Sequence, residues 1–184
     1  MNRIAFLKEG LKNLRTTGTV TPSSRFLCQA MLREVDFATS RVLVELGAGN
    51  GVITRHILDA MAPDARLLVF EVQPNFCELL RKIDDDRLVV IEDSAEYLPQ
   101  YLQQYGFEKA NHIISAIPFV ILPKELATRI VETCRDHLLP GGFFVQMHYS
   151  TVLKPLYKGI FKRVRIRFMP LNIPPAFVFV CAEK

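Results

Sequence analysis

Apolar and polar positions follow two periods along this chain of 184 residues. Short unbroken apolar runs indicate buried strands, and apolar residues spaced three or four apart indicate helices. The runs predict strands at 41–45, 66–70, 88–91, 112–115 and 142–148. Helical stretches alternate with them and begin near 52, 74, 93, 121 and 151. Strands that alternate with helices predict an α/β fold with a mostly parallel sheet.

The last two predicted strands lack a helix between them. Residues 163–168 alternate with period two, 176–181 form a buried run, and a proline-rich turn at 170–175 joins them. A parallel sheet can accept such an antiparallel hairpin at its edge. We therefore expect seven strands in all, with a C-terminal antiparallel hairpin and N-terminal helices before the first strand.

Two helical stretches precede that first strand. Ile4, Leu7, Leu11 and Leu14 form an apolar stripe flanked by basic residues, which predicts a short basic amphipathic helix within 1–17. Such a helix either lies in a membrane interface or packs on the domain, and the stripe does not separate the two. Residues 18–184 would form a single domain, whose first helix we place after Thr21 and Pro22, with Phe26 among its inward residues.

A glycine loop follows the first strand, in the stretch V-L-V-E-L-G-A-G-N-G-V-I (42–53). Gly47, Gly49 and Gly51 bring a bare backbone up to the start of a helix, an arrangement typical of ligand-binding loops, although it also suits a plain tight turn. A dinucleotide fingerprint needs its third glycine where Val52 stands. Glu45 ends the strand, where open α/β sheets hold their ligands.

Acidic residues also follow the next two strands. Glu71 comes about twenty residues after the loop and is placed to bind both hydroxyls of a ribose, although it could be a surface carboxylate. Asp93 follows the third strand, with Glu96 three residues on, which is the spacing of a helix cap.

The charge is unevenly distributed. Residues 1–25 carry +4 and residues 150–184 carry +6, whereas 26–149 carry −6. Basic ends suggest an anionic partner, either nucleic acid or lipid, or simply solvated charge. No apolar run is long enough to span a membrane, the N-terminus has no secretory pattern, and the four scattered cysteines show no metal-ligand spacing. We expect a cytoplasmic protein without a metal, peripherally bound to the inner face of a membrane.

The loop E-L-G-A-G-N-G resembles motif I of the class I S-adenosylmethionine-dependent methyltransferases. A narrower resemblance covers nearly the whole chain. The segment G-T-V-T-P-S-S-R (18–25), S-A-I-P-F (115–119) and N-I-P-P-A (172–176) are similar to motifs of the bacterial phospholipid N-methyltransferases. That resemblance implies a class I Rossmann-like fold, S-adenosylmethionine as cofactor, and methylation of the amine of a phosphatidylethanolamine-type lipid.

The resemblance also implies roles for individual residues. Glu45, Gly47, Gly49 and Gly51 would hold the amino-acid end of the cofactor, and Glu71 its ribose. Asp93, Ser94 and Ala95 would hold the adenine, and Ser115 would line the methyl-transfer zone. Ile117, Phe119 and Arg25 would contact the substrate.

His148 and Tyr149, at the end of the fifth strand, are the candidates to face the amine. His148 could equally be a surface residue at the strand end. Tyr149 and Phe119 could offer aromatic faces to a methylated ammonium. Lipid phosphates would meet exposed cations, for which the candidates are Arg25, Lys154, Lys158, Arg163 and Arg165.

Two other functions remain possible. The rRNA adenine methyltransferases share the fold and use N-[IL]-P-[YF] after the fourth strand, but Ala116 stands where their Asn holds the target amine. This substitution argues against nucleic acid. A catalytically silent module that binds the cofactor and docks a partner through its basic ends is the second alternative.

Overall fold

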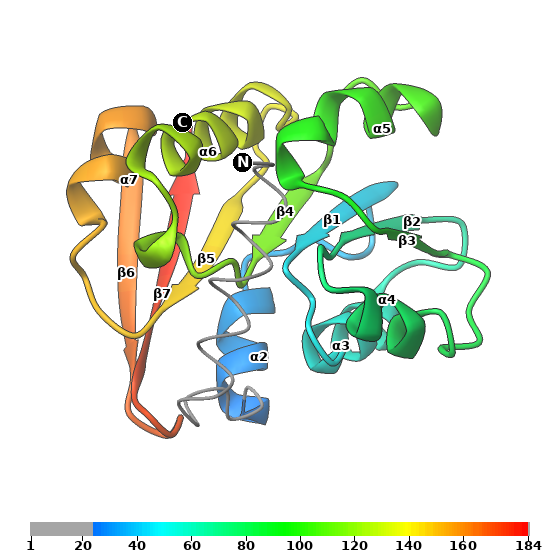
Figure 1. The fold of residues 1–184 in the computed structure, drawn as a ribbon, viewed down its shortest axis with the longest axis horizontal. Coiled ribbons are helices and arrows are strands. Elements are labelled where there is room, and N and C mark those ends of the chain that lie inside the picture. Colours follow the sequence, from blue (N-terminus) through cyan, green and yellow to red (C-terminus); the bar gives the residue numbers. More distant parts are fainter. Residues whose placement is uncertain (1–23, 184) are drawn as a thin grey trace.

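The computed structural model describes residues 24–183, and they form one seven-stranded sheet with helices on both faces (Figure 1). The strands are β1 (Val42–Leu46), β2 (Arg66–Phe70), β3 (Leu88–Ile91), β4 (His112–Ser115), β5 (Phe144–His148), β6 (Arg163–Met169) and β7 (Ala176–Ala182). The helices are α2 (Arg25–Leu32), α3 (Val52–Ala60), α4 (Pro74–Leu80), α5 (Leu98–Gln104), α6 (Lys124–Asp136) and α7 (Lys154–Ile160). Two short 3-10 turns, η1 (Ala95–Tyr97) and η2 (Phe119–Ile121), precede α5 and α6.

The strands pair in the order β3-β2-β1-β4-β5-β7-β6. Strands β1 to β5 are parallel, and β7 and β6 form the antiparallel hairpin. The order reverses between β1 and β4, which is the switch point where open α/β sheets bind ligands. The fold predicted from the apolar pattern is therefore confirmed.

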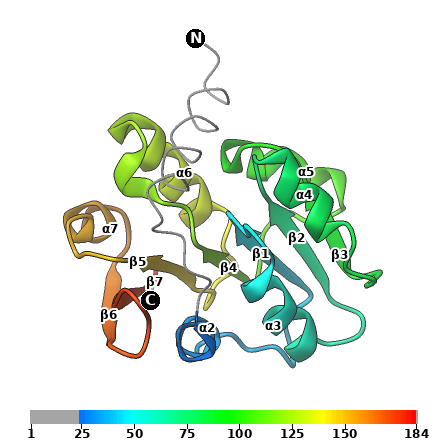
Figure 2. The same ribbon diagram turned by 60° about the horizontal axis from the view of Figure 1, so that its bottom comes forward.

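Helices cover the two faces of the sheet separately (Figure 2). Helices α2 and α3 pack on one face, against side chains such as Leu43 and Val145. Helices α5, α6 and α7 cover the other face, against side chains such as Val44 and Phe144. Neighbouring strand residues face opposite layers because side chains alternate along a strand.

The parallel strands end at a common level. Leu46 of β1 lies opposite Phe70 and Ser115, Ser115 lies opposite Gln146 of β5, and Gln146 lies opposite Phe179 of β7. We call the side of the sheet just beyond this row the carboxyl edge. The loops that follow β1, β2, β3, β4 and β5 all emerge there, so the residues expected to bind ligands share one edge.

Several local predictions were wrong. Helix α2 begins at Arg25 with Ser24 as its cap, whereas Thr21 and Pro22 lie outside the described residues. Phe26 is 41% exposed and does not face inward. Asp93 is not a helix cap, since the Ser94 side chain accepts from the Glu96 N–H instead.

Two boundaries in the later half also differ. Helix α6 begins at Lys124 and not at 121, because residues 119–121 form a 3-10 turn and Pro123 is not helical. Helix α7 begins at Lys154 and not at 151. The basic helix predicted within 1–17 lies outside the described residues. All four cysteines are buried, as predicted for core residues. Within residues 24–183 no helix is long and apolar enough to cross a bilayer.

Candidate active site

The glycine loop presses against the segment that follows β4. Gly47 has φ +73, and a Cβ added there would lie 3.1 Å from Cγ1 and 3.2 Å from the backbone nitrogen of Ile117. Its N–H donates to the carbonyl of Phe70 at 2.8 Å. Gly51 caps α3 in a left-handed conformation, and a Cβ there would lie 2.9 Å from Leu80. Glycine is thus required at both positions for the loop to reach the switch point.

The carboxylate of Glu71 joins the glycine loop to the turn after β2. Its Oε2 accepts from the Gly49 N–H at 2.9 Å, and its Oε1 accepts from the Gln73 N–H at 2.8 Å. The residue is only 5% exposed. The backbone therefore fixes this carboxylate in place, as the predicted binding of two ribose hydroxyls requires.

The carboxylate of Glu45 differs from that of Glu71, because backbone N–H groups do not hold it in place. Its side chain is 1% exposed, and among residues 24–183 neither oxygen has a hydrogen-bond partner of ordinary geometry. Burial raises the pKa of Glu45 to about 8, with Thr54 acting against this shift and Glu71 adding to it. The Thr54 hydroxyl beside it is also buried, and within the described part of the chain it makes no hydrogen bond of ordinary geometry, so its interaction with Glu45 is weak. A buried, unpaired carboxylate at the end of β1 is suited to a cationic ligand group, which would stabilise its ionised form.

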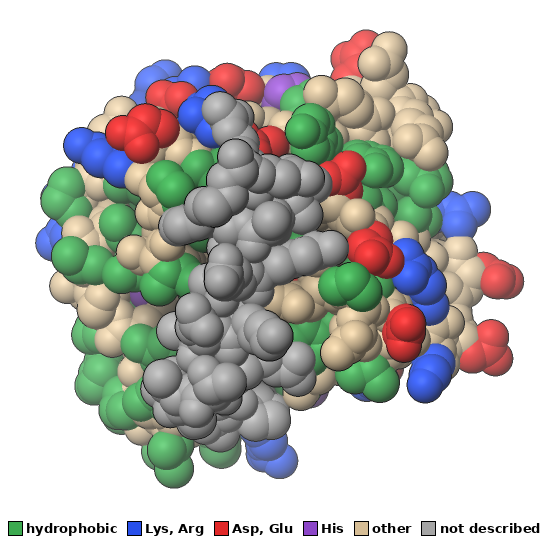
Figure 3. Space-filling view, viewed as in Figure 1, with side chains coloured by type: hydrophobic (Ala, Val, Ile, Leu, Met, Phe, Trp, Pro, Cys, Tyr) green, Lys and Arg blue, Asp and Glu red, His purple; other side chains and the backbone are tan. Residues whose placement is uncertain are grey.

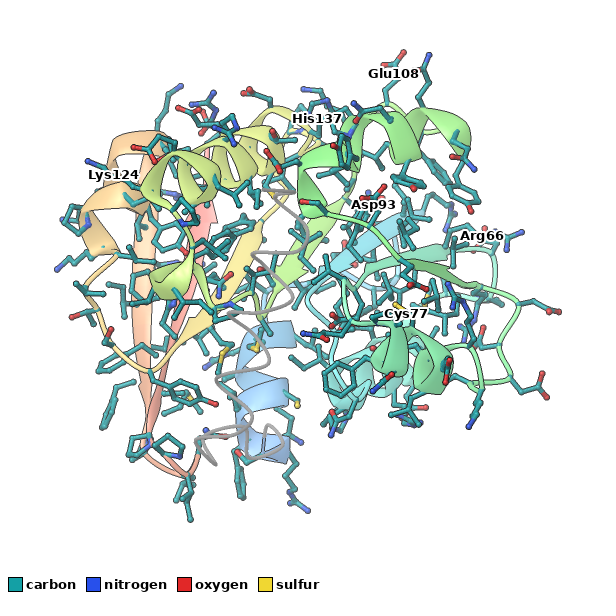
Figure 4. The ribbon with its side chains drawn as sticks, in the orientation of Figure 1. Arg66, Cys77, Asp93, Glu108, Lys124 and His137 are labelled. Carbon is teal, nitrogen blue, oxygen red and sulfur yellow. The ribbon has the colours of Figure 1, made fainter. Side chains whose placement is uncertain are left out.

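Asp93 and Ser94 begin the segment between β3 and α5 (Figure 4). Asp93 accepts from the Ser94 N–H at 2.7 Å and from the Tyr101 hydroxyl at 3.1 Å. Ser94 and Ala95 are buried, whereas Asp93 is partly exposed. The Tyr101 bond orients the Asp93 carboxylate, and sequence reasoning did not anticipate this contact.

The segment after β4 is held by a buried glutamine. The Nε2 of Gln146 donates to the carbonyl oxygens of Ile117, at 3.0 Å, and Met147, at 2.6 Å. Gln146 is completely buried, and its Oε1 has no hydrogen-bond partner among the residues that the structure describes. Ser115 is also buried, and its Oγ accepts from the Ile117 N–H at 3.3 Å. Gln146 was missed from the sequence, although a lone amide within an apolar strand was the available signal.

His148 lies in the core and not at the surface. It is 4% exposed, and its Nε2 shares a 2.7 Å hydrogen bond with the Tyr157 hydroxyl. The rings of Phe119 and Phe179 surround it, at centroid distances of 6.5 and 5.3 Å. Burial lowers the pKa of His148 to about 4, so it is a weak base. The suggestion that it is a surface residue was wrong, and its surroundings favour a structural role over one facing the amine.

The other expected substrate residues are scattered. Phe119 is 1% exposed and packs within the core, so its ring does not form an open wall. Ile117 is partly buried beside Gly47, and Tyr149 is 45% exposed at the end of β5. Arg25 lies at the start of α2, with its guanidinium 5.2 Å from the ring centroid of Phe26.

Most of the expected cofactor residues thus meet around the switch point. Glu45, the glycines, Glu71 and the Ser115–Ile117 turn are linked by direct contacts or by strand pairing, and Asp93 follows on the next strand. A bare loop, an unpaired buried carboxylate and a backbone-anchored carboxylate fit an amino-acid group followed by a ribose. The residues present therefore fit S-adenosylmethionine. No group of three His, Cys, Asp or Glu side chains suited to a metal occurs within residues 24–183.

Comparisons with known proteins agree with this geometry. The family described as the methyltransferase small domain matches residues 11–167. The chain is 36% identical over 179 residues, 96% of its length, to the ornithine lipid N-methyltransferase of Singulisphaera acidiphila, and covers 93% of that protein. It is 25% identical over 138 residues, 70% of its length, to the ribosomal RNA small subunit methyltransferase A of a Nostoc species, covering 48% of that protein.

Solved structures give the same fold. The precorrin-6y C5,15-methyltransferase of Geobacter metallireducens superposes with a TM-score of 0.67 at 12% identity, over 86% of this chain and 88% of that one. The resemblance to lipid N-methyltransferases inferred from the motifs is confirmed by the relative at 36% identity. The chain therefore belongs to the methyltransferase small domain family, within the class I methyltransferases that use S-adenosylmethionine.

Proposed function

We propose that this enzyme methylates the primary amine of a membrane lipid head group. The observation that carries the proposal is the 36% identity, over nearly the full length of both chains, to a relative named for N-methylation of an ornithine lipid. The motifs P-S-S-R (22–25) and N-I-P-P-A (172–176), which resemble those of phospholipid N-methyltransferases, support the same acceptor class. Phosphatidylethanolamine and ornithine lipid both offer a primary amine, so both are candidate substrates.

S-adenosylmethionine supplies an electrophilic methyl group when it is bound. In our proposal Glu45 pairs with the cationic amino-acid end of the cofactor, and Glu71 holds the ribose through the oxygens that also anchor Gly49 and Gln73. Asp93, oriented by Tyr101, takes the adenine. The protein contributes mainly orientation and the exclusion of water.

In our proposal the segment after β4 positions the acceptor amine. Gln146 holds the carbonyl of Ile117 at the switch point, and Gly47 lies directly against the same residue. The Gln146 Oε1 is an unpaired acceptor in the same place, and an amine N–H is a suitable donor for it. We assign Gln146 and Ile117 to positioning of the acceptor, with Ser115 holding the turn.

The substrate ammonium must lose a proton before its lone pair can attack. A His148 with a pKa of about 4 is too weak a base for this step, and its Nε2 is engaged with Tyr157. Tyr149 is half exposed, and partial burial raises its pKa, so it stays a neutral phenol at pH 7. The proton is therefore released to solvent, and Tyr149 contributes an aromatic face and a hydroxyl.

We further propose that the enzyme works on the inner face of the cytoplasmic membrane, held there partly by its basic ends. Lys154, Lys158 and Arg163 are exposed and available for anionic lipid phosphates. Arg165 was expected among them, but it pairs with Glu34 at 2.7 Å, and Arg167 binds the same carboxylate. One Glu34 carboxylate therefore faces two guanidinium groups, so it neutralises only part of their charge, and Arg165 is less available to lipid phosphates.

The test is methyl transfer to lipids dispersed in a non-ionic detergent, with the products identified by mass spectrometry. Phosphatidylethanolamine and ornithine lipid are offered separately, beside phosphatidylcholine as the lipid without a free amine. Products carrying one or more added methyl groups on either amine lipid support the proposal. Methylation of ribosomal RNA without any lipid product would replace it with the nucleic-acid alternative, for which the rRNA relative at 25% identity is the supporting observation. Cofactor binding without any methylated product would indicate the silent module.

A further inference from the structure

The turn between β6 and β7 is apolar, exposed and placed beside the site. Residues 168–177 contain no charged side chain. Within this turn Leu171 is 63% exposed and Ile173 is 79% exposed, and Phe168 at its start is 56% exposed. Exposed apolar clusters of this kind mark contact surfaces for proteins or membranes. We call Phe168, Leu171 and Ile173, together with the neighbouring Phe26, the apolar tip.

The fold holds these side chains outward. Asn172, between Leu171 and Ile173, is 2% exposed. Its Oδ1 accepts from the Ser24 N–H at 3.0 Å, and its Nδ2 donates to the carbonyl of Pro174 at 2.8 Å. Because Asn172 faces inward, both of its neighbours face solvent. The Ser24 bond also places the start of α2, with Phe26 and Arg25, beside the turn.

The tip projects beyond the carboxyl edge. The row at which the parallel strands end passes through Phe179 of β7. Because β7 is antiparallel to β5, its first residue, Ala176, lies three residues outside this row, or about 10 Å beyond it. The turn itself lies further still, past the end of β5 in Figure 1. In Figure 3 hydrophobic side chains gather over this corner, at the lower left, and no acidic side chain is visible there.

Other exposed apolar side chains come from segments that follow the carboxyl ends of the parallel strands. Many of those within residues 24–183 follow the carboxyl ends of β3, β4 and β5 or lie in the tip: Tyr97, Val120, Tyr149, Val152, Phe168, Leu171 and Ile173. A lipid substrate must approach the switch point from this side, since the acceptor residues lie at the same edge.

We propose that the apolar tip inserts into the lipid bilayer and so turns the carboxyl edge, with its methyl-transfer site, toward the membrane. This inference rests on the proposed lipid substrate. A charge-free tip is matched to the acyl-chain region, and Arg25 beside it is matched to head-group phosphates. The insertion is distinct from electrostatic attraction by the basic ends, because it operates on bilayers without net charge.

The chain lacks tryptophan, so an introduced tryptophan is a clean reporter of insertion. The probe is the Ile173→Trp variant of the full chain with vesicles of phosphatidylcholine and phosphatidylethanolamine. Its emission should shift to the blue and be quenched by brominated acyl chains. The Leu139→Trp control, at the opposite edge where Leu139 is 39% exposed, should show neither change. Unchanged emission from Ile173→Trp, or equal quenching of both probes, would overturn the proposal.

A second pair of variants measures the contribution to binding. Leu171→Ser combined with Ile173→Ser should lower partitioning to these neutral vesicles by about tenfold or more, because both apolar side chains lose their burial. Thermal unfolding and methylation of detergent-dispersed lipid should remain as in the wild type. The matched control, Tyr105→Ser with Leu139→Ser, removes two exposed apolar residues from the opposite edge and should bind normally.

The outcomes separate the two proposals. If the Leu171→Ser, Ile173→Ser variant methylates dispersed lipid and still binds vesicles as the wild type does, the insertion is overturned. The proposed function then stands. Absence of methylation on any dispersed lipid counts against the proposed function itself. A blue-shifted Ile173→Trp emission without vesicles, together with a dimer by light scattering, would show that a second copy of the chain covers the tip and would overturn the membrane assignment.

Discussion

The carboxyl edge of the sheet has two halves that differ in almost every physical property. Beyond β1 and β2, charged groups are buried and tied to backbone, as Glu71 is to Gly49 and Gln73. Beyond β5 and the hairpin, apolar side chains such as Ile173 are exposed, and the nearby charges are exposed cations such as Lys154 and Lys158. The first half suits a small polar ligand, whereas the second suits the surface of a lipid bilayer. We infer that the cofactor reaches the switch point from the polar half of the edge and that the acceptor reaches it from the apolar half.

The largest expected effect is on the polar half. Glu71→Ala should weaken binding of S-adenosylmethionine by well over tenfold, because it removes the proposed ribose contacts and also two hydrogen bonds that hold the loop, each worth about 1.5–3 kcal/mol to a charged acceptor. Isothermal titration measures the affinity. Glu78→Ala, an exposed acid on α4, is the matched control. An unchanged affinity would remove Glu71 from the site.

Glu45 tests whether burial of an unpaired carboxylate serves the ligand. Glu45→Gln should weaken cofactor binding by about tenfold, since one pKa unit of differential interaction corresponds to about 1.4 kcal/mol. The same variant should gain stability relative to the wild type as pH rises, provided that no cofactor is present. If Glu45→Gln keeps both the wild-type affinity for the cofactor and the wild-type pH dependence of stability, Glu45 is only a packed core residue.

The sign of that stability change follows from the pKa. Glu45 has a pKa of about 8 in the folded protein against 4.5 ordinarily, so the folded state keeps a proton that the unfolded state has lost. Wild-type stability therefore falls between about pH 4.5 and pH 8, by up to about 1.4 kcal/mol per pH unit from this group. Urea unfolding at pH 5 and pH 8 should show the decline in the wild type and a smaller one in Glu45→Gln.

Gln146 lies where the two halves meet. Gln146→Leu leaves the carbonyl of Ile117 without its donor and removes the unpaired Oε1. We expect kcat on dispersed lipid to fall by about tenfold through loss of positioning, with cofactor affinity nearly unchanged. A parallel loss of cofactor affinity would mean that Gln146 supports the whole switch point. Full activity would exclude it from acceptor positioning.

The smallest effect is expected at His148. His148→Phe should keep kcat within about threefold and leave the pH profile of kcat unchanged, while the melting temperature falls because Tyr157 loses its partner, at about 1–3 kcal/mol. Steady-state rates between pH 6 and 9 and thermal unfolding provide the comparison. Loss of one limb of the pH profile would restore His148 as a base.

The polar half was the easier to predict from the sequence. Strand β1, its glycine loop and α3 are consecutive, so the apolar run and the glycine spacing already specify their geometry. Glu71 could be placed because parallel strands end at one edge. The buried state of Glu45 and its raised pKa could not be predicted, because they depend on burial in the folded core and on the nearby side chains of Thr54 and Glu71.

The acceptor half required tertiary information. His148 ends its strand, which suggested exposure, but α7 folds over it and brings Tyr157 within 2.7 Å. Phe26 fits a helical stripe, yet its side of α2 is left uncovered. Ser94 replaces Asp93 as the cap because the chain turns one residue later than the spacing implied. Contact with another element decided the state of His148, which the local pattern could not show.

Methylation of a lipid amine can be measured by transfer of radiolabelled methyl groups from S-adenosylmethionine to vesicles. One set of vesicles contains phosphatidylethanolamine, a second contains ornithine lipid, and a third contains phosphatidylcholine alone. We expect label in mono-, di- or trimethylated lipid from the first or second set and none from the third. Cofactor binding by titration without label in any lipid would contradict the account, even though the fold would stand.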